Sequence, residues 1–204
     1  MFCLSSIIKN HLPDINRDMK KSLLKVFIVF ICALFISYQC YCQNFKLRVV
    51  FIRHAEKTAE GDNLTCAGLN RSLQLPAVIV SKFGIPDYTY VPSLGLGENT
   101  KRGRMFQTVS PLAIKYDLAI NSKYDEDDAT DIADDIMQKK GTVLVVWEHH
   151  EIISIVEALG IHNQDLIWNH NDFDSIWIVT FDKNGKATFA EDTEGIRPSS
   201  SCPD

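Results

Sequence analysis

Two apolar runs rich in β-branched residues, 46–52 and 142–147, constrain the fold most, because each has the composition of a strand buried on both faces. Helical patterns lie between and after these runs, and we expect helices near 64–82, 104–116, 125–139 and 151–159. Further strands are predicted at 88–91 and 118–121, and a hairpin of 175–182 and 186–190 turns at 183–185. Strands that alternate with helices predict an α/β domain: a three-layer α/β/α sandwich with a mostly parallel central sheet.

The composition is that of an ordinary globular protein. The chain has 204 residues, of which 46% are hydrophobic and 23% charged, and its formal net charge is −5. Nucleic-acid binding would require a basic stripe or a strongly positive domain, so we expect no nucleic-acid partner. The length predicts one domain with short flanking segments.

The segment 19–42 has the layout of a secretory signal peptide. Two lysines follow Met19, an apolar run covers 26–38, and the small residues Cys40 and Cys42 fit the positions before a cleavage site. The run is short for a membrane-spanning helix, which needs about 20 apolar residues. We therefore expect export to a periplasm or secretion, with an uncleaved leader as the alternative and the one route to a membrane.

The remaining chain divides around this leader. Residues 1–18 form an upstream segment that an over-long start would explain, with Met19 as the true initiator. A single domain is expected over 43–192. The segment 193–204 contains Pro198 and three serines and is predicted to be a disordered tail.

Four of the six cysteines lie in the segment 1–42, which leaves Cys66 and Cys202 in the exported domain. These two can form one disulfide in an oxidising compartment or remain free thiols, and the sequence leaves both open. No spacing of cysteines and histidines resembles a zinc site, so no metal is expected.

Polar residues follow both buried strands. Arg53 and His54 come directly after 46–52, and His149 comes two residues after 142–147. The carboxyl ends of strands in open α/β sheets are where ligands bind. Arg104 begins a helix after a glycine-rich loop and is a third candidate for the same edge.

Together these segments resemble the histidine phosphatase superfamily, the phosphoglycerate mutase-like family. The resemblance rests on four segments in the family's order: 53–56 (RHAE), 64–71 (LTCAGLNR), 104–113 and 145–149. It implies the phosphoglycerate mutase-like fold and a phosphoric monoester hydrolase. It also implies a small phosphorylated substrate and no cofactor or metal.

The resemblance assigns a role to each matching residue. His54 would be the nucleophile that takes the phosphoryl group on a ring nitrogen. Arg53 and Arg104 would hold the phosphoryl oxygens, which suit the forked guanidinium group. His149 would complete the pocket. A cationic cage around a nucleophile is also what phosphoryl transfer requires on physical grounds, because that reaction depends on positioning and charge stabilisation.

The proton donor is the least determined part of the site. The glycine that usually precedes the second histidine is Glu148 here, a carboxylate that could lower the affinity for phosphate or serve as the acid, and no aspartate follows His149. An acidic run supplies Asp125, Glu126 and Asp127, of which we choose Glu126 as the tentative acid. The same run would serve equally well as a solvated cap at a helix N-terminus.

Other residues receive structural interpretations. Thr65 is expected to cap a helix and Gly68 to allow a close helix contact, while His150 is expected to face solvent. His162 and His170 fall in loops and match no motif. Two alternatives to an exported phosphatase stay open: a phosphate-binding module with little turnover, and a protein phosphohistidine phosphatase.

Overall fold

The computed structural model describes residues 23–25, 27, 45–95, 97–162 and 165–203. The chain separates into two units, Met1–Asn44 and Phe45–Asp204. In the first unit only 23–25 and 27 are described, and they are helical. The expected upstream segment and signal peptide therefore lie almost wholly outside the described residues. None of the helices that are described is long and apolar enough to cross a membrane.

The second unit is built on a six-stranded sheet. Its strands, among the described residues, are β1 (Phe45–Arg53), β2 (Tyr88–Tyr90), β3 (Ile120–Asn121), β4 (Gly141–Trp147), β5 (Ser175–Asp182) and β6 (Ala187–Thr193). They lie in the order β3-β2-β4-β1-β5-β6. The four strands from β3 to β1 are parallel, whereas β5 is antiparallel to β1 and to β6. This confirms the mostly parallel sheet expected from the sequence.

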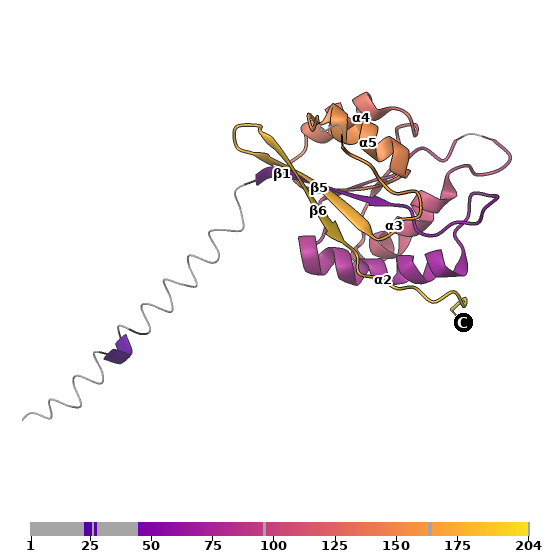
Figure 1. Ribbon diagram of the computed structural model, residues 1–204, viewed down its shortest axis with the longest axis horizontal. Helices are drawn as coiled ribbons and strands as arrows, with labels where there is room; N and C mark the ends of the chain where they lie inside the picture. Colours follow the sequence, from indigo (N-terminus) through magenta and orange to yellow (C-terminus); the bar gives the residue numbers. More distant parts are fainter. Residues whose placement is uncertain (1–22, 26, 28–44, 96, 163–164, 204) are drawn as a thin grey trace, which may run out of the picture. The chain divides into compact units, whose positions relative to one another are not determined.

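Two pairs of helices cover the two faces of the sheet. These helices are α2 (Cys66–Phe83), α3 (Gly103–Tyr116), α4 (Ala129–Met137) and α5 (His149–Ala158). Figure 1 shows α4 and α5 over one face and α2 and α3 over the other. The three layers confirm the predicted α/β/α sandwich.

The alternation of side chains along β4 explains why both of its faces are apolar. Val143 and Val145 belong to the core cluster beneath α4 and α5. Leu144 and Val146 point the other way, into the cluster beneath α2 and α3. Because successive strand residues face opposite sides, a strand between two helical layers must be apolar throughout.

Helix α2 begins at the expected cap and continues through a proline. The Thr65 side chain accepts a hydrogen bond from the Gly68 N–H at 3.1 Å, which confirms the predicted cap. Pro76 lies inside the helix, which continues to Phe83. The helix is therefore not shortened at this proline.

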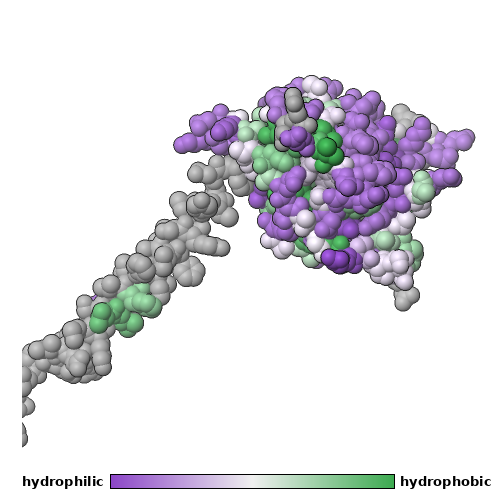
Figure 2. All heavy atoms as spheres, viewed as in Figure 1, coloured by the Kyte–Doolittle hydropathy of each residue, from purple (hydrophilic) through white to green (hydrophobic). Residues whose placement is uncertain are grey.

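The surface matches the composition. The visible face of the domain is mostly hydrophilic, with small hydrophobic areas (Figure 2). The large apolar side chains are instead collected in the two clusters on either side of the sheet.

Candidate active site

The parallel pairing of β1 and β4 brings the two predicted strand-end histidines to one edge of the sheet. Arg53 is in register with Trp147, and the His54 N–H donates to the Trp147 carbonyl oxygen at 3.0 Å. His149 follows two residues after Trp147, as the first residue of α5. The structure thus places His54 and His149 just after the ends of two neighbouring parallel strands, at one edge of the sheet.

The His54 ring is fully buried and has a defined tautomer. Its Nδ1 atom lies 2.7 Å from the carbonyl oxygen of Ala55. A carbonyl oxygen only accepts hydrogen bonds, so Nδ1 carries the hydrogen and Nε2 carries the lone pair. Nε2 is buried and has no hydrogen-bond partner among the described residues. Burial lowers the pKa of His54 to about 3, the Ala55 carbonyl opposes the shift, and the charges of Arg104 and Arg53 add to it. His54 is therefore a neutral imidazole with a free lone pair.

Thr108 fixes the backbone beside His54. Its hydroxyl accepts from the Ala55 N–H at 2.9 Å and donates to the Arg104 carbonyl oxygen at 2.7 Å. The first turn of α3 is thereby attached to the end of β1. Ala55 itself is fully buried.

The Arg53 guanidinium is held by the loop that precedes β5. Its Nη1 donates to the backbone carbonyls of His170 and Asp172, the second at 3.2 Å. Its Cζ atom lies 4.1 Å from the centre of the Phe173 ring. The remaining Nε atom is buried without a partner among the described residues. Burial lowers the pKa of Arg53, but an arginine stays charged at any physiological pH.

Arg104 approaches the site from the first turn of α3. Its Nη1 lies 3.3 Å from an Asp62 carboxylate oxygen and its Nη2 lies 3.4 Å from Glu126. The Arg104 Nε is also buried without a partner in the described part of the chain. The charges of Arg53 and Arg104 both lower the pKa of His54, so the two cations act on the same ring.

Of the three candidates in the acidic run, Glu126 forms an ion pair with Arg104 in the described structure. Asp125 and Asp127 are exposed, whereas Glu126 is half-buried between Arg102, at 3.0 Å, and Arg104. The indole N–H of Trp147 donates to the Glu126 backbone carbonyl at 2.8 Å and ties this segment to β4. Burial raises the pKa of the Glu126 carboxyl, and the two arginines only partly offset this.

Glu148 has a different environment from Glu126. One carboxylate oxygen accepts from the His150 N–H at 2.8 Å, which caps α5, and the other contacts His149 Nδ1. Burial would raise the pKa of Glu148, but the His150 N–H and the charges of His149 and His150 outweigh it and the net shift is downward. Glu148 is thus a capping and orienting carboxylate.

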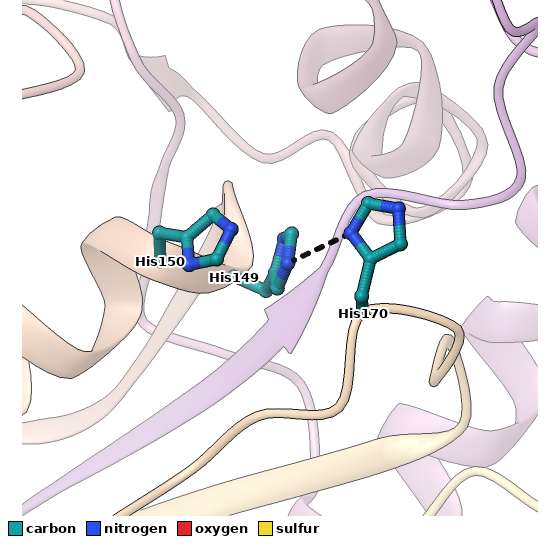
Figure 3. A group of neighbouring side chains, drawn as sticks. All are labelled: His149, His150 and His170. Atoms are coloured by element: carbon teal, nitrogen blue, oxygen red, sulfur yellow. Dashed lines mark hydrogen bonds between the residues drawn. The ribbon is translucent and has the colours of Figure 1, made fainter.

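His149 also contacts a histidine that the sequence analysis left unassigned. The His149 Nε2 atom lies 3.4 Å from His170 Nδ1, and the ring of His150 stands on the other side of His149 (Figure 3). Burial lowers the pKa of His149 and the charge of Arg53 lowers it further. No motif in the sequence indicates His170, and its place at the site follows from the direction of β5. Because β5 runs antiparallel to β1, the loop before Ser175 reaches the edge where β1 ends.

A buried arginine connects the segments behind the site. Arg71 of α2 lies 2.9 Å from Glu56, 2.6 Å from Glu194 and 3.4 Å from Asp174. Burial raises the pKa of the Glu194 carboxyl to about 7, although Arg71 acts to lower it. Glu56 therefore holds the chain after His54 against α2.

Gly68 lets α2 approach that same segment. A Cβ atom at this position would lie 2.2 Å from the backbone oxygen of Glu56. The Glu56 oxygen instead accepts from the Thr65 N–H at 2.9 Å. The expected close contact at Gly68 is confirmed.

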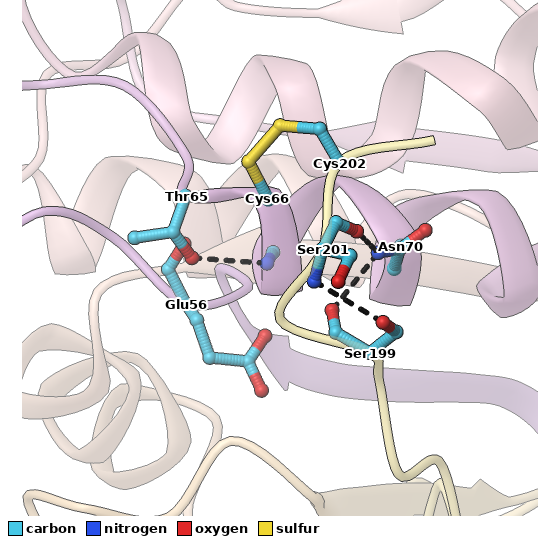
Figure 4. Close-up of a disulfide and its surroundings, with 8 residues drawn as sticks. Glu56, Thr65, Cys66, Asn70, Ser199, Ser201 and Cys202 are labelled. Atoms are coloured by element: carbon cyan, nitrogen blue, oxygen red, sulfur yellow. Dashed lines mark hydrogen bonds between the residues drawn. A yellow bond between two sulfur atoms is a disulfide. The ribbon is translucent and has the colours of Figure 1, made fainter. Parts of the chain in front are cut away.

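The C-terminal segment is attached to α2 and is not a disordered tail. Cys66 and Cys202 form a disulfide, which settles the pairing that the sequence left open (Figure 4). The Asn70 amide donates to the backbone carbonyls of Ser199, at 2.9 Å, and Ser201, at 2.6 Å. The prediction of disorder was wrong because it weighed the proline and serine content and not the cross-link.

Comparison with known proteins supports the fold through structure alone. No protein-family model and no curated protein sequence matches this chain. Among solved structures, it is similar to the protein histidine phosphatase SixA complexed with tungstate, with 18% identity, a TM-score of 0.51, and coverage of 72% of this chain and 97% of that one. A putative phosphohistidine phosphatase SixA from Agrobacterium tumefaciens has 16% identity, a TM-score of 0.50, and coverage of 74% and 97%. Phosphoglycerate mutase from Plasmodium falciparum has 12% identity, a TM-score of 0.50, and coverage of 79% and 99%.

These neighbours are members of the histidine phosphatase superfamily, and they are covered almost completely. The domain described above therefore has the phosphoglycerate mutase-like fold.

Proposed function

We propose that this chain is an exported phosphatase that hydrolyses a phosphomonoester through a phosphohistidine intermediate on His54. The observation that carries the proposal is the environment of one atom. His54 Nε2 is an unpartnered lone pair on a neutral, buried ring, with two arginines acting on it. A phosphorus atom bearing negatively charged oxygens is the electrophile that such a site suits.

In the first step the Nε2 lone pair of His54 attacks phosphorus, and the ester P–O bond breaks. Arg53 and Arg104 each keep a buried Nε–H without a partner among the described residues, and these groups are available to the phosphoryl oxygens. Glu126 gives its proton to the leaving oxygen. The raised pKa of its carboxyl, caused by burial, favours the protonated form that this role needs.

In the second step water attacks the phosphorus of phospho-His54. The P–N bond breaks, its electron pair returns to Nε2, and inorganic phosphate leaves. Glu126, now ionised, accepts the proton from the attacking water. The cycle ends with the neutral imidazole and the protonated carboxyl that began it, so protons and electrons balance.

Hydrolysis of a generic aryl phosphate by the full chain and by a His54→Ala variant tests this proposal. We expect the variant to lose hydrolysis, and we expect a phosphoenzyme that is labile in acid and stable in base to form only in the wild type. His162→Ala is the matched control, because His162 is exposed and lies outside the cluster of Figure 3. Equal rates in the wild type and His54→Ala would overturn the proposal.

Phosphate binding without turnover would instead support a phosphate-binding module. A panel of phosphorylated sugars, nucleotides, inositol phosphates and a phosphohistidine peptide then distinguishes substrate classes. Selective hydrolysis of the peptide would support the protein phosphohistidine phosphatase alternative. Both alternatives use the same phosphate-binding residues, Arg53, His54 and Arg104. The effect of His54→Ala and the results of the substrate panel are therefore interpreted together.

Export is the second part of the proposal. The signal-like layout of 19–42 supports it, and so does the disulfide between Cys66 and Cys202, because disulfides persist mainly in oxidising compartments. We expect a mature N-terminus at Gln43, which N-terminal sequencing of the expressed protein in its native compartment would reveal. Recovery of uncleaved protein in the cytoplasm with reduced thiols would contradict export.

A further inference from the structure

Three histidines from two separate segments lie close together beside the proposed phosphate site of Arg53, His54 and Arg104. His149 and His150 begin α5, and His170 lies in the loop before β5. One nitrogen from each ring can be chosen so that the three atoms all lie within 4.8 Å of one another. Figure 3 shows His149 between the other two rings. No role in the proposed reaction uses His150 or His170.

The spacing of the two central nitrogens fits a metal ion. His149 Nε2 and His170 Nδ1 are 3.4 Å apart. Zinc binds imidazole nitrogen at about 2.0–2.1 Å with tetrahedral geometry, so two of its nitrogen ligands are separated by about 3.3–3.4 Å. A single ion can therefore lie at bonding distance from both atoms. The exposed ring of His150 can turn toward the same point.

The Glu148 carboxylate bears on the tautomer of His149. It contacts His149 Nδ1, and a carboxylate at that nitrogen favours a hydrogen on Nδ1 and a lone pair on Nε2. A carboxylate on the distal nitrogen of a histidine is the usual outer partner of a metal-bound imidazole. Glu148 is itself fixed, because its other oxygen accepts from the His150 N–H.

The loop that carries His170 is held in place from several directions. The His170 carbonyl accepts from Arg53 Nη1. The Asp172 carboxylate accepts from the N–H groups of Asp174, at 2.8 Å, and Ser175, at 3.0 Å. The Trp168 indole donates to the Asp172 carbonyl at 3.1 Å. Little ordering would therefore be needed for His170 to act as a ligand.

We infer that His149, His150 and His170 form a binding site for one divalent ion of the late first-row transition metals, with Zn²⁺ as the best fit to a set of imidazole ligands. A consequence rests on the proposed function. Metal on His149 Nε2 removes the group expected to contact the phosphoryl oxygens, so the ion inhibits the phosphatase and competes with phosphate. Removal of the ion by EDTA accordingly does not lower activity.

Direct binding of Zn²⁺ tests the site without any assay of activity. Calorimetry on the full chain, with no phosphate present, is compared among the wild type, His170→Ala, His150→Ala and His162→Ala. We expect His170→Ala to weaken one binding event at least about tenfold and His162→Ala to leave it unchanged. The cysteines of 1–42 are present in every variant, so metal bound to them does not enter the comparison. Equal Zn²⁺ binding by His170→Ala and His162→Ala would overturn the inference.

Two further measurements sharpen the result. Bound Co²⁺ should give the intense visible bands of a tetrahedral site in the wild type and lose them in His170→Ala. Glu148→Gln, which keeps the side-chain volume, should weaken Zn²⁺ binding about tenfold through the orientation of His149. An unchanged Co²⁺ spectrum in His170→Ala would contradict the site.

Inhibition is measured as the ratio of rates with and without Zn²⁺ for each variant. Zn²⁺ should lower the ratio in the wild type and in His162→Ala but much less in His170→Ala, and inorganic phosphate should weaken Zn²⁺ binding. Failure of the two proposals can be told apart. If the wild type binds Zn²⁺ but hydrolyses no substrate, the metal site is supported and the phosphatase proposal is contradicted. If it hydrolyses substrate but does not bind Zn²⁺, only the metal site is contradicted.

Discussion

The Nδ1 atom of His54 donates a hydrogen bond to the carbonyl oxygen of Ala55, its own neighbour in the chain, at 2.7 Å. The Ala55 N–H is bound in turn by Thr108. The backbone of one short segment therefore sets the tautomer and the direction of the ring. A carbonyl cannot change its charge, so this orientation is independent of pH.

The first prediction concerns the acid limb of the pH profile. Burial lowers the pKa of His54 to about 3, so the lone pair on Nε2 is lost to protonation only below about pH 3. We expect kcat/KM for an aryl phosphate to fall with a midpoint near that value and not near 6.5, the ordinary value for histidine. Recovery of activity after return to neutral pH controls for unfolding. An acid limb with its midpoint near pH 6.5, at the same pH for substrates whose own pKa values differ, would contradict the neutral, buried ring.

The second prediction separates Glu126 from its neighbours through the leaving group. Glu126→Gln should lower kcat for an alkyl phosphate about 10²–10⁴-fold, because an alkoxide needs a proton as it leaves. Nitrophenyl phosphate, whose leaving group is stable as an anion, should lose much less. Asp125→Asn is the matched control, since Asp125 is exposed and contacts Arg102 but not Arg104 in the described structure. Equal losses of kcat for the alkyl and the nitrophenyl phosphate would show that Glu126 is not the acid.

The third prediction concerns the close approach of α2 to the chain after His54. Gly68→Ala would place a methyl carbon 2.2 Å from the Glu56 oxygen, and backbone has to move to relieve that contact. We expect a loss of at least about 1–3 kcal/mol in the free energy of unfolding, measured by urea denaturation. Gly97→Ala is the control, because its added carbon would meet no atom nearer than 3.9 Å. Comparable stability of the two variants would show that α2 can shift freely.

The fourth prediction concerns the disulfide. Cys66 and Cys202 are separated by 136 residues, and a cross-link over so long a loop restricts the unfolded chain strongly. We expect the Cys66→Ser/Cys202→Ser double variant to lose about 2–4 kcal/mol in the free energy of unfolding. Added reductant should destabilise the wild type by the same amount and leave the double variant unchanged. If reductant destabilised the wild type and the double variant equally, the loss of stability would not come from the disulfide between Cys66 and Cys202.

The fifth prediction concerns Glu194 and the pH dependence of stability. The pKa of its carboxyl is about 7 in the folded protein, raised by burial, against about 4.5 when unfolded. Between these values the folded state keeps a proton that the unfolded state releases. The free energy of unfolding should therefore decrease as pH rises through this window, by up to about 1.4 kcal/mol per pH unit.

Glu194→Gln should lack that component of the slope. Urea denaturation of both proteins between pH 4.5 and 8 measures the difference between the two curves. His54 contributes a slope of the opposite sign below its ordinary pKa, but it is present in both proteins and cancels. Parallel curves would contradict a raised pKa for Glu194.

The parts of the site that the sequence predicted are those that follow from strand ends. Two strands with apolar residues on both faces had to be central, and central parallel strands end at a common edge. That reasoning brought His54 near His149. The choice of Glu126 over Asp125 and Asp127 was tentative in the sequence analysis, because a loop pattern does not show that Glu126 is half-buried and its two neighbours exposed.

Two further features depended on contacts between distant segments. The position of His170 follows from the antiparallel direction of β5, which a hairpin pattern does not specify relative to β1. The C-terminal segment looked disordered from its proline and serine content, yet Cys202 and the buried Ile196 attach it to the domain. Composition describes the average behaviour of a segment, and one cross-link overrides it.

The hydrogen bonds from Arg53 to the loop before β5 have a consequence for how this site can evolve. Arg53 is held by the main-chain carbonyls of His170 and Asp172, and every amino acid supplies the same carbonyl. The side chain at position 170 can therefore be exchanged without loss of the support for the guanidinium. A lineage can therefore discard the histidine at this position, and with it the metal site that we propose, while Arg53 keeps its backbone support.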